Sequence, residues 1–411
     1  MARSIVIIGG GAAGPLVALH LARVARIPTE VSVIEPRSRL AEGVAYGTTD
    51  PTHLLNVPAA GMSAFDEEPN GFVAWAGCAP GDFVARARYA EYLRAELAHC
   101  VEANPSFSLR HVRDSATRID VVKRRVTVSS GESFTGQSIV IALGNAAPMK
   151  PAWIESYSNT PVIADPWQSG ALDTVTTGSR VLCVGTGLTF VDVSLSLARR
   201  GAKVTGVSRH GLLPAVHAHF GSLPSMTTEL SSPVSVSRWI REQDDWRAAL
   251  ATLRTSTQRL WRSFTMAQQA QFLRHARRHW DVHRHRMAAE IAEQLEHEIA
   301  VGNIEVHRGD ARTFAESRSF DFVVLCTGPD DAALLRAAPL ASLAAEGTIC
   351  AGPHGMGIAT DADTGQVHDS NGQLVEGLYA VGPLRRGTLW ESTAVPEIRS
   401  EARRLASLLL V

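Results

Sequence analysis

The chain opens with a short apolar segment, a glycine-rich turn and a longer apolar segment. Residues 4–8 are typical of a strand buried on both faces of a parallel sheet, and residues 16–24 are typical of an apolar helix. Pro15 falls in the first helical turn, where its missing N–H costs little. A second apolar run at residues 30–34 ends in Glu35. This order of strand, helix and strand predicts the start of an α/β nucleotide-binding fold.

The turn between the first strand and helix has the spacing G-x-G-x-x-G, and Glu35 follows 21 residues after its last glycine. Glycines allow a tight turn and a close approach to a pyrophosphate, the helix start supplies N–H groups, and the acid can accept hydrogen bonds from a ribose. This context favours a dinucleotide site over a purely structural turn. Because Glu35 disfavours a 2′-phosphate, FAD or NAD is expected. The predicted cofactor-binding residues are Gly9, Gly11, Ala12, Ala13, Gly14 and Glu35.

The same pattern recurs at residues 179–207, with a strand at 179–184, a helix at 188–199 and a strand at 203–207. The third glycine is replaced by Phe190, so we expect this helix to approach its strand less closely. The predicted cofactor-binding residues of this second motif are Gly185, Gly187, Leu188 and Thr189.

A basic residue, Arg209, stands where the first motif has its acid. A guanidinium can pair bidentately with a 2′-phosphate, which indicates NADPH, with NADH as the alternative cofactor. The competing interpretation of Arg209 is a surface arginine at a strand end.

Further short apolar runs end in Gly144, Gly328 and Gly382, as expected for chain that returns to complete nucleotide-binding sheets. A last helix from Pro396 to Leu410 could direct its N-terminus at a flavin. The predicted fold class is therefore α/β, with two Rossmann-like dinucleotide-binding domains and a helical insertion. We assign residues 1–150 and 330–411 to a discontinuous FAD-binding domain, 151–220 and 300–329 to an NAD(P)H-binding domain, and 221–299 to a mainly helical insertion.

Composition and charge limit the kinds of partner that the protein is expected to have. The 40 Lys and Arg residues nearly balance the 41 Asp and Glu residues, which argues against nucleic acid or a membrane surface as a partner. No apolar run reaches the length of about 18 residues that a membrane span needs. The five cysteines are an odd number and include no C-x-x-C pair, so neither a disulfide framework nor a thioredoxin-type redox dithiol is indicated. We therefore expect a reducing compartment and a cytoplasmic protein. The sequence predicts no oligomeric state.

Three segments carry a resemblance to a known family: GVAYG at residues 43–47, HLLNVP with MS at 53–63, and WESTAVPEIR at 390–399. They resemble the bacterial FAD/NAD(P)-binding family that includes flavin-dependent urate hydroxylases and aspartate N-monooxygenases. The resemblance implies that NAD(P)H reduces FAD and that the reduced flavin reacts with oxygen. By resemblance, the residues beside the flavin include Tyr46, Asn56, Val57, Met62, Trp390 and Thr393.

The resulting hypothesis is an FAD-dependent, NAD(P)H-consuming monooxygenase that hydroxylates a small nitrogen-containing substrate with O2 through a flavin C4a-hydroperoxide. Most of this chemistry belongs to the cofactor, so no catalytic acid or base is assigned. Two alternatives stay open: an NAD(P)H:acceptor flavin reductase without oxygen insertion, and a non-catalytic flavin-bound redox sensor.

Residues 270–298 combine helical periodicity with a dense run of His and Arg. Within it, His283, Arg284 and Arg286 are candidates for binding an anionic substrate or cofactor phosphates. The alternative is a solvated helix whose Trp280 packs inward. No metal site is expected, because the H-E-x-x-H motif is lacking and neighbouring arginines repel cations.

Overall fold

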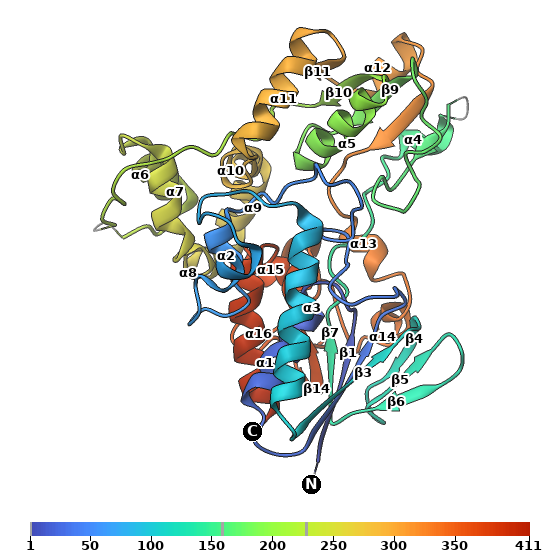
Figure 1. The fold of residues 1–411 in the computed structure, drawn as a ribbon, viewed down its shortest axis with the longest axis vertical. Helices are drawn as coiled ribbons and strands as arrows, with labels where there is room; N and C mark the ends of the chain where they lie inside the picture. The colour runs from blue at the N-terminus through green and yellow to red at the C-terminus, as the bar shows by residue number, and fades with distance from the viewer. Residues whose placement is uncertain (1, 158–159, 227–228) are drawn as a thin grey trace. The chain divides into compact units, whose positions relative to one another are not determined.

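The computed structural model describes residues 2–157, 160–226 and 229–411. It divides into two compact units, the first formed by Met1–Ala146 with Asp331–Val411 and the second by Ala147–Asp330. Each unit contains a largely or wholly parallel sheet with helices packed on it (Figure 1). The predicted α/β class is confirmed.

The first unit is organised around a six-stranded sheet in the order β13-β14-β7-β1-β2-β3. All neighbouring pairs are parallel except β13 with β14. Along β1, Ile5 and Ile7 belong to one hydrophobic core and Val6 and Ile8 to another, so both faces of the sheet are buried. The strands are β1 (Arg3–Ile8), β2 (Thr29–Ile34), β3 (Phe107–Val112), β7 (Ser138–Ile141), β13 (Gln366–His368) and β14 (Leu374–Ala380).

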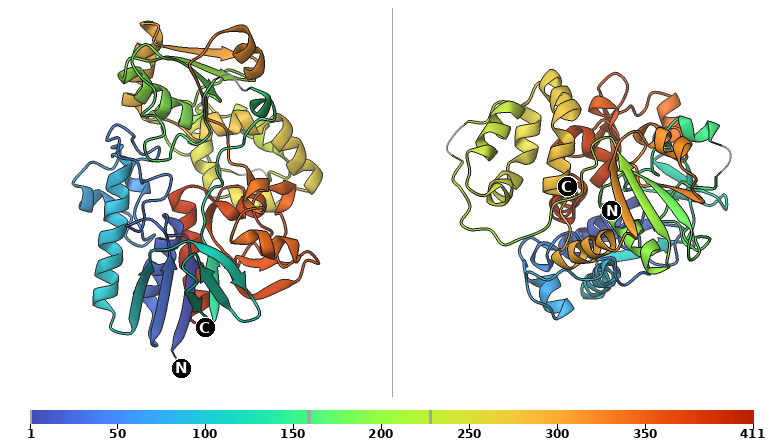
Figure 2. Two further views of the ribbon diagram at one scale, coloured as in Figure 1. Left: turned by 90° about the vertical axis from the view of Figure 1, so that its right-hand side faces the viewer. Right: turned by 90° about the horizontal axis from the view of Figure 1, so that it is seen from above.

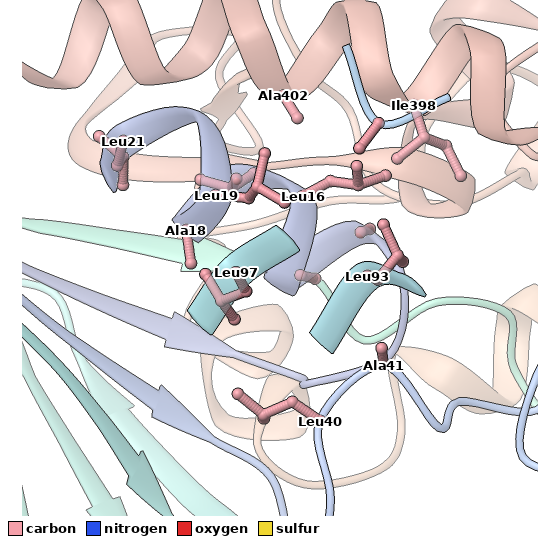
Figure 3. Packing of buried hydrophobic residues seen from close by; sticks show 14 of the residues in the cluster. Leu16, Ala18, Leu19, Leu21, Leu40, Ala41, Leu93, Leu97, Ile398 and Ala402 are labelled. Carbon is pink, nitrogen blue, oxygen red and sulfur yellow. The ribbon is translucent and has the colours of Figure 1, made fainter. Parts of the chain in front are cut away.

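One face of this sheet is covered by three helices, α1 (Ala13–Val24), α3 (Arg86–Ala103) and α16 (Val395–Leu409). In Figure 3, Leu16 and Leu19 of α1 lie between side chains of α3 and side chains of α16. The apolar run predicted as a helix therefore packs on both of its neighbours as well as on the sheet.

The other face is covered in part by a small antiparallel sheet formed by β4 (Ala116–Asp120), β5 (Arg125–Val128) and β6 (Ser133–Thr135), shown in Figure 2. Val126 and Phe134 of this sheet join the core that contains Val6 and Ile8. The shorter elements of the first unit are α2 (Gly71–Ala76), α13 (Asp331–Leu334), α14 (Leu340–Ala345), α15 (Arg386–Leu389), and the 3-10 turns η1 (Ala59–Gly61), η2 (Pro353–Gly355) and η3 (Gly382–Arg385).

The second unit contains a parallel five-stranded sheet in the order β11-β10-β9-β12-β8. Helices α5 and α11 pack against each other, while α4 and α12 contribute to a core with Leu182 and Val184. The elements are β8 (Val162–Ile163), β9 (Arg180–Val184), β10 (Lys203–Ser208), β11 (Ile304–Arg308), β12 (Phe322–Leu325), α4 (Trp153–Ser156), α5 (Leu188–Arg199), α11 (Ala289–Ala300) and α12 (Ala311–Ser317).

Phe190, which replaces the third glycine of the second motif, is fully buried between α5 and β10. A Cβ atom on Gly206 of β10 would lie only 2.5 Å from its ring. The strand therefore makes room for the aromatic ring, a compensation that the motif alone did not predict.

A run of helices occupies the predicted insertion: α6 (Pro233–Arg241), α7 (Trp246–Arg254), α8 (Thr257–Ser263), α9 (Met266–His275) and α10 (Arg277–Arg284). The helical periodicity expected over residues 270–298 is interrupted twice, after His275 and between Arg284 and Ala289. At the second break, Met287 donates its N–H to Ala215 and accepts from His217, so its backbone pairs outside any helix. Across the described ranges, no helix has the length and apolar character that spanning a bilayer requires.

A buried ion pair fastens α16 to the end of β14. Arg385 Nη1 lies 3.1 Å from Glu401 Oε2, and the two side chains are 3% and 0% exposed. Gly382 also donates its N–H to Glu401, and Arg385 donates to the carbonyls of Asp361 and Ala362. Burial raises the pKa of Glu401, while the charge of Arg385 opposes that rise.

Replacing Arg385 with Met should destabilise the first unit by about 3–5 kcal/mol, because it leaves the Glu401 carboxylate buried without its cation. Urea-induced unfolding measures this loss. The matched control is Glu376→Gln, which breaks an ion pair with Arg124 whose carboxylate partner is 86% exposed. It should cost at most about 1 kcal/mol. Equal losses for the two variants would contradict the structural role of the buried pair.

Candidate functional site

The topology of the first unit brings its glycine segments to one edge of the sheet. The chain passes from β1 to β2 on one side and later returns as β7 on the other side of β1, and ligands of open α/β sheets bind at the carboxyl ends of strands where the strand order reverses in this way. The predicted turn follows β1, Gly144 follows β7, and Gly382 follows β14. These three strands are neighbours in the sheet (Figure 1). Segments distant in the sequence therefore gather where a cofactor is expected.

The turn after β1 requires glycine at its first and last motif positions. Gly9 has a φ of +107°, and a Cβ there would lie 2.4 Å from the carbonyl oxygen of Ala142. A Cβ on Gly14 would lie 2.0 Å from the carbonyl oxygen of Gly9. Helix α1 then begins at Ala13, with Ala12 as an N-cap that supplies no side-chain hydrogen bond. Such a helix start keeps N–H donors for an anion, which fits a pyrophosphate.

Glu35 is buried directly after β2 and braces this turn. Its Oε2 accepts the N–H of Gly10 at 2.8 Å, and its Oε1 accepts the backbone N–H and the guanidinium of Arg37. A carboxylate has about four lone-pair sites, so one stays for a ribose hydroxyl. The ribose contact of Glu35 stays a prediction, and the structure adds a second role for it in fixing the glycine turn.

The loop that carries the GVAYG segment reaches the same turn. A Cβ on Gly43 would lie 2.9 Å from Cα of Gly11. The Tyr46 ring packs on that of Tyr89, with centroids 4.8 Å apart, and burial raises the pKa of both phenols, so both hydroxyls are neutral. The Tyr89 hydroxyl is buried and has no hydrogen-bond partner within the described ranges. Sequence reasoning missed Tyr89, which lies within a helical run without a motif.

Of three residues expected beside the flavin, two have buried side chains and one is half-buried. Val57 and Met62 belong to the helix-side core, with side chains 9% and 1% exposed, so those side chains do not line an open site. Asn56 is half-buried and lies between buried neighbours. The backbone of Val57 and Met62, rather than their side chains, is what these positions can offer to a cofactor.

The segment before α16 has an unusual backbone. Trp390 has a φ of +62°, a conformation uncommon outside glycine that clusters at functional sites, and its side chain is 7% exposed. The hydroxyl of Ser392 is fully buried without a partner among the described residues, and Thr393 is half-buried. Helix α16 starts at Val395 without a side-chain cap. Unpaired polar atoms and an uncapped helix beside glycine turns fit FAD.

The second unit repeats this geometry. Gly185 has a φ of +110°, and a Cβ there would lie 2.4 Å from the carbonyl oxygen of Cys326 at the end of β12. Gly187 is the N-cap of α5 and offers no side chain, so the N–H groups of Leu188 and Thr189 head an uncapped helix. A Cβ on Gly328 would meet no atom within 4 Å. The predicted residues of the second motif therefore surround a similar strand-to-helix turn.

A group of basic residues lies at the carboxyl ends of β10 and β11. Arg209 follows β10 and is exposed, and Arg308 ends β11 in register with Ser208. Partial desolvation and the positive charges of Arg278, Arg209, Arg308 and His279 lower the pKa of His210. Among the residues described, Arg209 and Arg308 form no ion pair. This positive group fits a phosphate. The sequence pattern predicts Arg209 but not Arg308, which could have been identified only by predicting that β11 pairs with β10.

The structure brings two of the three tentative substrate-binding residues to the start of α7. His283 meets the Trp246 ring edge-on, with centroids 4.7 Å apart, and Arg286 Cζ lies 5.9 Å from that ring. Arg284 is the last residue of α10. Trp280 packs on the helical core, as its inward interpretation predicted. In the part of the chain that is described, no group of three His, Cys, Asp or Glu side chains could hold a metal ion.

Comparisons with known proteins agree with this geometry. Residues 6–146 match the FAD-NAD(P)-binding family model. Reduced ornithine hydroxylase from Pseudomonas aeruginosa superposes with a TM-score of 0.61 at 14% identity, covering 100% of this chain and 99% of that one. A flavin-containing monooxygenase from Stenotrophomonas maltophilia gives 0.57 at 15% identity, covering 99% and 98%. Bacillithiol disulfide reductase from Bacillus cereus gives 0.54 at 15% identity, covering 100% and 99%. No curated protein sequence matches the chain significantly.

The fold with two dinucleotide-binding domains is thus confirmed, and the chain is a flavin-dependent oxidoreductase with FAD and NAD(P)H as cofactors. The comparisons do not test the assignment of individual contact residues or the resemblance to urate hydroxylases and aspartate N-monooxygenases. A second family model, L-lysine 6-monooxygenase/L-ornithine 5-monooxygenase, matches residues 79–330. Since this match spans more than half of the sequence, the chain belongs to the L-lysine 6-monooxygenase/L-ornithine 5-monooxygenase family.

Proposed function

We propose that this protein is an FAD-dependent monooxygenase that consumes NAD(P)H and hydroxylates a small nitrogen-containing substrate. The observation that carries the proposal is the pair of equivalent turns at Gly9 and Gly185, one in each unit, with the same 2.4 Å approach to a neighbouring carbonyl. Two such turns in one chain give one site for a flavin and one for its electron donor. The family match supports N-hydroxylation as the class of reaction.

FAD, when bound, supplies the redox chemistry, accepting hydride from the nicotinamide and activating oxygen. The residues of the chain then bind the cofactor and orient it. The uncapped start of α1 would hold the pyrophosphate, Glu35 would accept a hydrogen bond from a ribose hydroxyl, and the uncapped start of α16 would favour negative charge on the flavin ring. The packed rings of Tyr46 and Tyr89, whose phenols are neutral, would help to keep water away from the bound flavin.

In the second unit, we assign the basic group at Arg209 and Arg308 to the 2′-phosphate of NADPH. Two guanidiniums at adjacent strand ends can meet the three phosphate oxygens from two directions. This arrangement favours NADPH over NADH as the electron donor.

An NAD(P)H:acceptor reductase without oxygen insertion is the second candidate function. The fold is shared with a bacillithiol disulfide reductase as well as with hydroxylases, so architecture alone fits both. What separates the two functions is the fate of oxygen.

Replacing Gly11 with Ala should lower the amount of FAD that copurifies at least severalfold, because a methyl group obstructs the approach of the pyrophosphate to the turn. The fold itself should tolerate the change, since that Cβ would meet only Gly43 Cα at 3.5 Å. Flavin absorbance per protein gives the occupancy, and thermal unfolding of the flavin-free protein tests the fold. Gly81→Ala, at an open surface position, is the control. Full flavin occupancy in the Gly11 variant would place FAD elsewhere.

Replacing Arg209 with Ala should raise the Kd for NADPH by about tenfold to a hundredfold, since a charge-assisted hydrogen bond contributes about 1.5–3 kcal/mol. The Kd for NADH should change less than about twofold. Titration of the FAD-loaded enzyme with each nucleotide measures both. Arg318→Ala, which removes an exposed arginine of the same unit, is the control. A similar loss of affinity for NADH and NADPH would refute the phosphate assignment.

Oxygen insertion is tested by product analysis. With a panel of amino acids, other small amines and purines, we expect at least one compound to stimulate NADPH oxidation and to yield a product heavier by one oxygen atom, seen by mass spectrometry with ¹⁸O2. Hydrogen peroxide measured in parallel gives the fraction of oxygen that is not inserted. NADPH oxidation that depends on an added electron acceptor, with no labelled product from any compound, would favour the reductase.

A further inference from the structure

The helical segment of the second unit contains an arginine, Arg286, that has no counter-ion among the residues that the structure describes. Arg286 lies in the extended stretch between α10 and α11, and the backbone bonds of Met287 with Ala215 and His217 fix this stretch. Its Nε and Nη1 atoms are buried and have no hydrogen-bond partner among the described residues. No carboxylate described in the structure lies within ion-pair distance of it.

The surroundings of Arg286 are positive. Burial, followed by the charges of Arg284, Arg247 and Arg254, lowers the pKa of Arg286 to about 10, and the charge of Asp245 opposes this. One oxygen of Asp245 already caps α7, accepting the N–H of Arg247 at 2.7 Å. A desolvated cation among other cations is costly unless an anion joins it. The local charge therefore points to a missing negative ligand.

The site is built around one aromatic ring. Arg247 Cζ lies 4.3 Å from the Trp246 ring centroid, and Arg286 Cζ lies 5.9 Å from the same centroid. The Nε of Arg247 is also buried without a partner among the residues described. The ring beneath the Arg247 guanidinium, together with the hydrogen bond from its Nη2 to the Val216 carbonyl at 3.5 Å, limits the freedom of that side chain before a ligand arrives, and Arg286 lies at the outer range of a cation–π interaction with the same ring. Two preoriented forks with unused N–H groups match the oxygens of a carboxylate or a phosphate.

We propose that Arg286 and Arg247, held by Trp246, bind an oxyanionic group of a small-molecule ligand, either a carboxylate or a phosphate. The carboxylate source is the hydroxylation substrate and so depends on the proposed function, whereas the phosphate source is the nucleotide. The dense basic run of the sequence then divides between two sites. Arg278 and His279, near the start of α10, lower the pKa of His210, whereas His283 near the end of α10 and Arg286 after it lie beside the Trp246 ring.

Calorimetric titration of the FAD-loaded protein with inorganic phosphate tests the site directly. All proteins carry Arg209→Ala, so that binding at the other basic group is weakened equally. We expect the parent to bind phosphate, Arg286→Gln and Arg247→Gln to bind it at least about tenfold more weakly, and Arg286→Lys to lose less. Arg241→Gln, on an exposed position of α6, should bind like the parent. Equal affinity in the Arg286→Gln variant, or no phosphate binding by the parent, would overturn the proposal.

Thermal unfolding separates a binding role from a structural one. In buffer without polyvalent anions, Arg286→Gln should raise the unfolding midpoint by about 2–4 °C, because it removes a half-buried positive charge that lies among other positive charges. Phosphate should raise the midpoint of the parent and leave that of Arg286→Gln unchanged. A lower midpoint for the variant in the anion-free buffer would assign Arg286 a structural role and sink the proposal.

Two further measurements identify the source of the oxyanion in proteins that retain Arg209. A raised Kd for NADPH in Arg286→Gln supports the nucleotide phosphate, whereas an unchanged Kd with a raised KM for the substrate supports the carboxylate. An unchanged Kd and an unchanged KM would reject both sources. If the proposed function fails because no oxygen is inserted, the phosphate titration still reports on this site, so the two failures are distinguishable.

Discussion

The structure depends on how closely each glycine turn approaches the neighbouring strand. In both units the chain leaves the central strand so near to the carbonyl at the end of an adjacent strand that any side chain is excluded, at Gly9 against Ala142 and at Gly185 against Cys326. This close approach directs the start of the following helix at the sheet edge with its N–H groups unused. The remaining features of the two sites are placed relative to these two turns.

What distinguishes the two sites is charge. The strand after the first turn ends in the buried acid Glu35, whereas the equivalent strand of the second unit ends beside Arg209 and Arg308. The backbone geometry is the same, so a change in a few side chains at strand ends suits one turn to a ribose hydroxyl and the other to a phosphate. The fold determines where a ligand binds, and the side chains at the strand ends determine which ligand binds there.

Local patterns were enough to predict β1, β2, β9 and β10 within about one residue, because strands buried on both faces are continuously apolar. The parallel strands β3, β8 and β11 were not predicted. Local patterns were not enough to find the antiparallel sheet of β4 to β6, whose short strands mix polar and apolar residues. The break between α10 and α11 was missed because it arises from pairing with residues 215–217, far away in the sequence. Glu401 and Trp246 were missed for the same reason: their partners are contributed by other elements.

The packing of Phe190 against Gly206 restricts which substitutions these two positions can accept. Most dinucleotide-binding turns have a glycine at this position of the helix. Here the helix carries Phe190, and the glycine that makes room for it is Gly206 on the strand. A larger residue at position 206 would collide with the ring, and a smaller one at position 190 would open a void, so each residue restricts its counterpart. In natural homologues the residues at positions 190 and 206 should therefore vary together, with a bulky residue at only one of the two.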